Sequence, residues 1–172
     1  SNQKALYFPV EQNPNCRARA EDSSFAASQH GSIPFSRQYR IRAAATILAN
    51  PRRHKEIDGS STITANISGP EELILGSKFG MKMHLGINYR ILNTVVEYRK
   101  NELIAWRHLG MWRWRYELQD LGNGSTQVTE SFDASLAPFL SQIWLSARKA
   151  YPWTEKSVAK TLVRLKQVAE SI

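Results

Sequence analysis

A long alternation of apolar and polar residues constrains the fold of this chain more than any other feature. Between residues 72 and 85, even positions include Lys78, Lys82 and His84. The odd positions carry the apolar side chains Leu73, Leu75, Phe79, Met81, Met83 and Leu85. A period of two over this length predicts a β-strand with one face in the core and the other in water.

Shorter runs of the same kind lie on both sides of this segment. The sequence predicts strands at residues 35–41, 62–67, 72–85, 89–98, 103–108, 112–119 and 126–133. Two short helices, 43–50 and 51–56, follow the first strand, with Pro51 at the first position of the second. Successive strands joined by short turns form an antiparallel meander, so the predicted fold class is α+β.

The last predicted element is a long helix with one narrow apolar stripe. Thr154 is its expected N-cap and Lys156, Lys160 and Arg164 lie opposite the stripe. Spacings of four and three place five apolar residues on one side, namely Val158, Leu162, Leu165, Ala169 and Ile172. A curved antiparallel sheet of seven strands can wrap around one such helix.

Length and composition bound the organisation of the chain. Its 172 residues favour one domain, and the polar, turn-rich residues 1–31 predict an irregular extension before a domain at 32–172. The single cysteine, Cys16, excludes an intrachain disulfide. No apolar run approaches the roughly 20 residues of a membrane span. We therefore expect a cytoplasmic protein with no membrane span.

Five short segments resemble one known family. They are LANPRRHKEIDGS at 48–60, NTVVE at 93–97, IAWRH at 104–108, RWRYEL at 113–118 and GSTQVTE at 124–130. In their order and spacing they are similar to polyketide cyclase/dehydrase-like proteins of the START (SRPBCC) superfamily, over roughly residues 33–172. Between Ile41 and Leu48 this chain is about one helical turn shorter than the family pattern. This leaves two alternatives open, a stunted first helix or missing residues.

The resemblance implies a helix-grip fold and a loose range of activities. Members of that superfamily bind lipids, polyketides, hormones or quinones, and a minority catalyse cyclisation or dehydration. The superfamily has no shared catalytic motif, so the resemblance transfers no catalytic residue to this chain.

Hairpin geometry gathers large aromatic side chains on one face of the predicted sheet. A three-residue loop at Gly122-Asn123-Gly124 keeps that face apolar. It sets Phe132 opposite Trp114, Glu130 opposite Tyr116, Val128 opposite Leu118, and Arg113 beside Asp133 on the other face. A turn at Leu109-Gly110-Met111 sets Trp106 opposite Trp114 and His108 opposite Trp112.

This aromatic face predicts a cavity for an apolar or aromatic small molecule between the sheet and the C-terminal helix. The expected ligand-binding residues are Phe79, Met81, Met83, Trp106, His108, Trp112, Trp114, Tyr116, Glu130 and Phe132. The simpler interpretation is that these side chains fill the core against that helix.

Two alternatives to a binding protein stay open. A cyclase, dehydratase or hydrolase would use the same pocket with Glu130 as acid or base, and His108 is the other titratable candidate. A basic partner-binding domain would instead have a filled core. The four histidines are scattered without metal-ligand spacing, so the sequence predicts no metal site and no cofactor.

The net charge of +8 raises the question of a polyanionic partner. The basic residues are spread along the chain, in groups such as Arg52, Arg53 and Lys55, and the aromatic side chains point to the apolar face. Bases that stack on aromatic rings need those rings among the cations. The sequence therefore argues against nucleic-acid binding, and it leaves the oligomeric state open.

Overall fold

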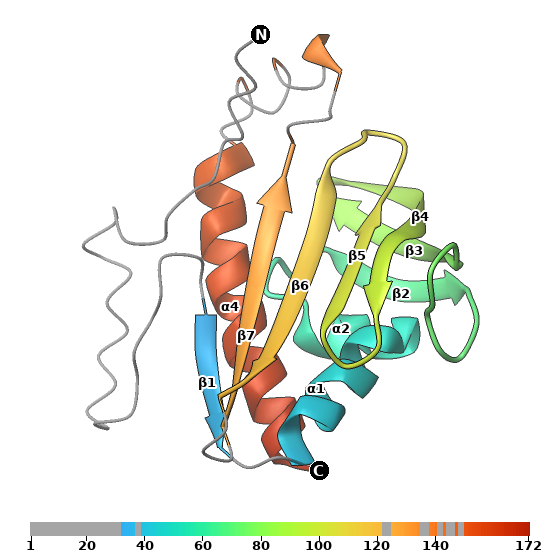
Figure 1. The fold of residues 1–172 in the computed structure, drawn as a ribbon. Helices are drawn as coiled ribbons and strands as arrows, with labels where there is room; N and C mark the ends of the chain where they lie inside the picture. Colours follow the sequence, from blue (N-terminus) through green and yellow to red (C-terminus); the bar gives the residue numbers. More distant parts are fainter. Residues whose placement is uncertain are drawn as a thin grey trace, which may run out of the picture.

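The protein is a curved antiparallel sheet with helices on one face (Figure 1). The computed structural model describes residues 32–36, 39–121, 125–134, 138–140, 143, 147 and 150–172. Seven strands form one sheet in the order β1-β7-β6-β5-β4-β3-β2, and every pair of neighbours is antiparallel. This architecture confirms the predicted helix-grip fold; the expected extension at 1–31 lies outside the described residues.

The strands agree with the predicted meander apart from two boundaries. They are β1 (Ser32–Ser36), β2 (Ile63–Ser68), β3 (Lys78–Leu85), β4 (Ile87–Arg99), β5 (Leu103–Arg107), β6 (Arg113–Asp120) and β7 (Ser125–Asp133). The prediction that β3 begins at residue 72 is wrong. Leu73 instead donates its amide to the carbonyl of Ala49, and Gly76 adopts a φ of +80°, so this stretch is a loop.

The first strand ends before the predicted position because a helix begins there. The helices are α1 (Tyr39–Ala49), η3 (Pro51–Arg53), α2 (His54–Ile57) and α4 (Ala150–Glu170). The prediction of a strand at residues 39–41 is wrong. Of the two alternatives left open for the first helix, the stunted helix is not found, because α1 has 11 residues. Ala44, Ile47 and Leu48 are buried with helical spacing, so the core-facing stripe overrides the short alternation before it.

The C-terminal helix packs through the stripe that the sequence predicts. Val158, Leu162, Leu165 and Ala169 are buried in the core, whereas Ile172 lies beyond the helix end and is exposed. The helix begins at Ala150, so the prediction that Thr154 caps it is wrong. The helix packs against α1, α2, β1 and β7 and lies along one face of the sheet (Figure 1).

One expected solvent-facing cation of α4 has a structural role. Lys156 and Lys160 are exposed as predicted, but Arg164 is half-buried and donates to the carbonyl oxygen of Asp58. This bond fixes the loop after α2 against the middle of the helix. The prediction that Arg164 lies on a fully solvated back is therefore wrong.

Gly59 allows that loop to touch the helix backbone. A Cβ atom at this position would lie 2.2 Å from the carbonyl oxygen of Ser157 and 2.4 Å from the amide nitrogen of Thr161. The Gly59 amide also donates to the Thr161 hydroxyl over 3.0 Å. Only glycine fits this approach, because both obstructing atoms belong to the helix backbone.

We expect Gly59→Ala to lower the free energy of unfolding by about 1–3 kcal/mol or more, since overpacking against backbone forces the loop away from α4. Chemical denaturation monitored by circular dichroism measures this. Lys55→Ala, an exposed change in the adjacent helix α2, is the control and should leave the midpoint unchanged. Equal stability of Gly59→Ala and the unmodified protein would contradict the packing described.

Candidate functional site

The strand register brings the predicted aromatic residues to the concave face of the sheet. Trp106 pairs with Trp114 across β5 and β6, and Trp114 pairs with Phe132 across β6 and β7. Tyr116 pairs with Glu130 in the same ladder. These are the pairings predicted from the hairpin loops, and the register confirms them. Gly122-Asn123-Gly124, the loop from which they were argued, lies outside the described residues.

A buried layer of stacked rings occupies the deep part of this face. Trp106 stacks on Tyr116 at a centroid distance of 5.3 Å and on His54 at 4.8 Å. Phe79 meets both Trp106 and His54 edge-on, at 5.6 and 5.4 Å. Phe79, Trp106 and Tyr116 are therefore packed against one another and against α2, together with the buried Met81.

His54 is a member of this layer that sequence reasoning missed. Its Nε2–H donates to the carbonyl oxygen of Leu48 over 2.8 Å, and burial lowers its pKa to about 4. The ring is therefore neutral near pH 7, and Nδ1 is the unprotonated nitrogen. Nδ1 has no hydrogen-bond partner in the described part of the chain. The sequence signal available for His54 was its place three residues after Pro51, in the short helix predicted at 51–56.

Glu130 is a buried carboxyl at the end of the ring layer. The Tyr116 hydroxyl donates to its Oε1 over 2.7 Å, whereas Oε2 is buried and has no partner among the described residues. Burial is the main reason that the pKa of Glu130 rises to about 8; the Tyr116 bond opposes the rise and the Asp58 charge adds to it. At pH 7 the group is thus mostly a neutral acid with one O–H to donate.

The concave face becomes more exposed toward one end of the sheet. On β3, β6 and β7, Met81, Tyr116 and Glu130 are buried. Two residues away on the same face of each strand, Met83, Trp114 and Phe132 are half-buried. We call the half-buried group the rim cluster; it comprises Met83, His108, Trp112, Trp114 and Phe132. Met83 lies near the β3–β4 turn, and the other four lie near the β5–β6 turn and the adjoining end of β7. The predicted site residues thus divide into a packed layer and a partly exposed rim.

Four residues of the rim cluster form two ring pairs. Trp114 and Phe132 have a centroid distance of 4.9 Å, and the His108 ring meets Trp112 edge-on at 4.4 Å. The Gly110 amide donates to His108 Nδ1 over 3.0 Å, and burial lowers the His108 pKa. His108 is thus a neutral ring whose Nε2 carries the proton, held in place by the turn.

A groove of about 520 Å³ lies at the opposite end of the sheet, between α1 and the β4–β5 turn. Its walls mix charged and apolar groups, including Arg42, Thr46, Glu72, Tyr98, Arg99 and Ile104. No residue predicted to bind ligand lines it. Because charged side chains contribute to its walls, it is a poorer match than the rim cluster for an apolar ligand.

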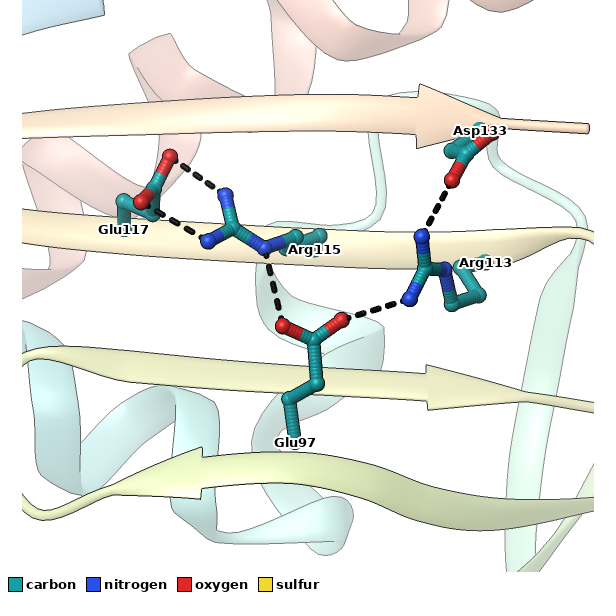
Figure 2. A network of polar contacts seen from close by, with 5 residues as sticks. All are labelled: Glu97, Arg113, Arg115, Glu117 and Asp133. Carbon is teal, nitrogen blue, oxygen red and sulfur yellow. Dashed lines mark hydrogen bonds and ion pairs between the residues drawn. The ribbon is translucent and has the colours of Figure 1, made fainter. Parts of the chain in front are cut away.

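The convex face of the sheet carries an ion-pair network (Figure 2). Glu97 on β4 accepts from both Arg113, over 2.8 Å, and Arg115, over 3.3 Å. Arg113 also pairs with Asp133, as predicted, and Arg115 pairs with Glu117. Both arginines already have carboxylate partners, so neither is free to bind a nucleic-acid backbone.

Two other kinds of site receive no support from the described residues. No three His, Cys, Asp or Glu side chains among them lie close enough together to hold a metal ion. No helix in the same part of the chain has the length and apolar composition needed to cross a bilayer.

Comparison with known sequences finds relatives without an assigned activity. No protein-family profile matches the chain. The uncharacterised protein Rv0088 of Mycobacterium tuberculosis is 46% identical over 125 residues, which are 70% of this chain and 56% of that protein. The chain thus spans only about half the length of this curated relative.

Comparison with solved structures finds the same fold at low sequence identity. The KanY protein has a TM-score of 0.60 at 13% identity, covering 81% of this chain and 94% of its own. The Polyketide_cyc-like protein Cgl2372 of Corynebacterium glutamicum has 0.51 at 16%, covering 81% and 90%. The di-domain ARO/CYC protein StfQ, from the steffimycin biosynthetic pathway, has 0.54 at 11%, covering 81% and 50%.

Proposed function

We propose that this chain, which has the helix-grip fold of the polyketide cyclase-like proteins, binds a small apolar molecule that contains a ring system. The observation that carries the proposal is the change in exposure along the concave face, from a packed layer to the half-buried rim cluster. Half-buried aromatic rings retain apolar surface that a ligand can remove from water, at about 25 cal/mol per Å².

The rim cluster suits a flat ligand. Trp112, Trp114 and Phe132 offer ring faces and edges, and aromatic pairs prefer offset-stacked or edge-to-face contacts. Their orientation is held by the sheet and by the His108 turn, so little side-chain freedom is lost on binding. The StfQ likeness supports the proposal at the level of the fold, since that protein carries the ARO/CYC description.

Glu130 supplies a polar group beside this apolar surface. It lies two residues from Phe132 on the same face of β7, a distance of roughly 7 Å along the strand. As a neutral acid it can donate from Oε2 to a carbonyl or hydroxyl oxygen of the ligand while Oε1 accepts from Tyr116. A single buried donor of this kind would fix the orientation of the ligand.

Catalysis at the same group is the second candidate function. A general acid works best when its pKa is close to the working pH, and that of Glu130 is about 8. Protonation of a ligand carbonyl or hydroxyl by Glu130 would serve a cyclase, dehydratase or hydrolase. Glu130→Gln separates the two functions, because a binding protein should keep most of its affinity and an enzyme should lose turnover.

We expect Trp114→Ala to weaken binding of an apolar, environment-sensitive dye by about tenfold, since an aromatic contact and its buried area contribute roughly 1–2 kcal/mol. Fluorescence titration measures the affinity. Phe132→Ala should act in the same direction, and Leu92→Ala, on the exposed outer face of β4, should have no effect. Unchanged affinity in both rim variants would exclude the rim cluster as the binding surface.

Native mass spectrometry of protein purified from its source would identify a retained ligand directly. A bound molecule with a ring system and an oxygen acceptor would support the proposed class. A retained molecule with neither feature would exclude it.

A further inference from the structure

The turn between β3 and β4 carries two large aliphatic side chains in water. Leu85 is 52% exposed and Ile87 is 72% exposed, and they pair directly across Gly86. Gly86 has a φ of +76° and open space around it, so the chain reverses sharply and the tip projects from the molecule. Isolated exposed apolar residues are ordinary, but an adjacent pair at a projecting tip indicates an interaction surface.

The hairpin behind this tip is purely cationic. Residues 73–96 contain Lys78, Lys82 and Arg90 and no aspartate or glutamate. Lys82 and Arg90 are exposed, pair directly across the two strands, and have no carboxylate partner among the described residues. Like charges directly opposite one another destabilise a sheet. The pair therefore favours an external anion, unlike Arg113 and Arg115, whose charges are met by carboxylates within the sheet.

A second turn of the sheet also carries an exposed aliphatic side chain. Leu109, in the turn between β5 and β6, is 96% exposed. β5 ends at Arg107, opposite Thr94 of β4, whereas β4 begins at Ile87. The β3–β4 turn therefore extends well beyond the level of the β5–β6 turn. Exposed aliphatic tips backed by cations match the boundary of a bilayer, where apolar groups enter the acyl region and cations meet lipid phosphates.

We propose that the tip of the β3–β4 hairpin docks on lipid bilayers that carry anionic headgroups. Leu85 and Ile87 enter the headgroup region, and Lys82 and Arg90 lie against the phosphates. A projecting tip with unpaired cations fits a deformable anionic surface better than it fits a protein groove. The inference does not depend on the ligand proposed above.

Vesicle sedimentation tests the proposal with the chain of 172 residues. The protein should bind phosphatidylcholine vesicles containing about 30% phosphatidylglycerol much more tightly than pure phosphatidylcholine, and high salt should weaken the binding. Lys82→Gln with Arg90→Gln should lower the partition coefficient by about 10- to 30-fold, because each cation near an anionic surface contributes roughly fivefold. Leu85→Ser with Ile87→Ser should lower it at least tenfold.

Ile74→Ser with Leu75→Ser is the matched control. These residues are 54% and 63% exposed, but they precede β3 and so lie at its other end. Their replacement should leave binding unchanged, and circular dichroism should show the same fold in every variant. The proposal is overturned if the unmodified protein binds neither kind of vesicle. It is also overturned if the control variant binds as weakly as the tip variant. It is also overturned if sedimentation velocity shows that the unmodified protein is a dimer and that Leu85→Ser with Ile87→Ser is a monomer, because the tip would then bind a second copy.

Discussion

Replacing Glu130 with glutamine should make the protein more stable at alkaline pH. The folded-state pKa of about 8 lies above the ordinary value of 4.5, so the folded protein binds more protons than the unfolded chain between these limits. The stability of the unmodified protein should therefore fall as pH rises from about 4.5 to 8. The difference corresponds to about 4–5 kcal/mol at roughly 1.4 kcal/mol per unit.

Glutamine keeps the shape and the acceptor for Tyr116 but cannot ionise. Glu130→Gln should be nearly neutral at pH 5 and stabilising by several kcal/mol above pH 8, and urea denaturation across this range measures both. Glu102→Gln, which changes an exposed carboxyl, should leave the pH dependence of the unmodified protein intact. A Glu130→Gln protein that is equally or less stable at pH 8.5 would show that the folded protein stabilises the Glu130 carboxylate.

Leu162→Asp should prevent folding. Leu162 is 1% exposed and is held in the core by the sheet-facing side of α4, so an aspartate there would be a buried charge without a partner. The milder Leu162→Ala should lower the free energy of unfolding by about 2–5 kcal/mol through the cavity that it leaves.

The neighbouring residue supplies a matched control. Val163 is 43% exposed on the same helix, so Val163→Asp introduces the same charge one position away and should change the melting temperature by only a few degrees. Circular dichroism and thermal melting distinguish the outcomes. A folded Leu162→Asp protein with an unchanged melting temperature would mean that α4 does not pack on the sheet.

Most of the sheet could be predicted from the sequence because its signals are local. Alternation fixes which residues of a strand share a face, and hairpin loop length fixes the register between neighbours. The pairing of Tyr116 with Glu130 follows from these two rules alone. The apolar stripe of α4 is equally local, since Leu162 and Leu165 recur at helical spacing.

The boundaries that were mispredicted depend on contacts distant in sequence. Residues 72–77 alternate like a strand, but the Ala49 carbonyl and β4 divert them into a loop. Residues 39–41 fit both the period of a strand and the period of a helix. Burial of the following α1 residues against the core decides in favour of the helix. The start of α4 is not marked by Thr154, which is buried four residues into the helix.

The sequence predicted which residues share the concave face. It did not predict which of them are buried and which are half-buried. Trp106 and Trp114 are equivalent in the alternation, yet one is buried and the other is half-buried. The difference arises because His54 stacks on Trp106, and that contact joins residues 52 positions apart. Alternation identifies the face of a strand and carries no information about what covers each position on it.

The ion pairs on the convex face make the residue types at several positions depend on one another during evolution. Glu97, Ala105 and Arg115 form one row across β4, β5 and β6, so the carboxylate reaches the guanidinium over the residue between them. A short side chain at position 105 is the condition for that reach. In lineages where a larger residue replaces Ala105, the charges at 97 and 115 should change with it, and an alignment of relatives should show these positions varying together.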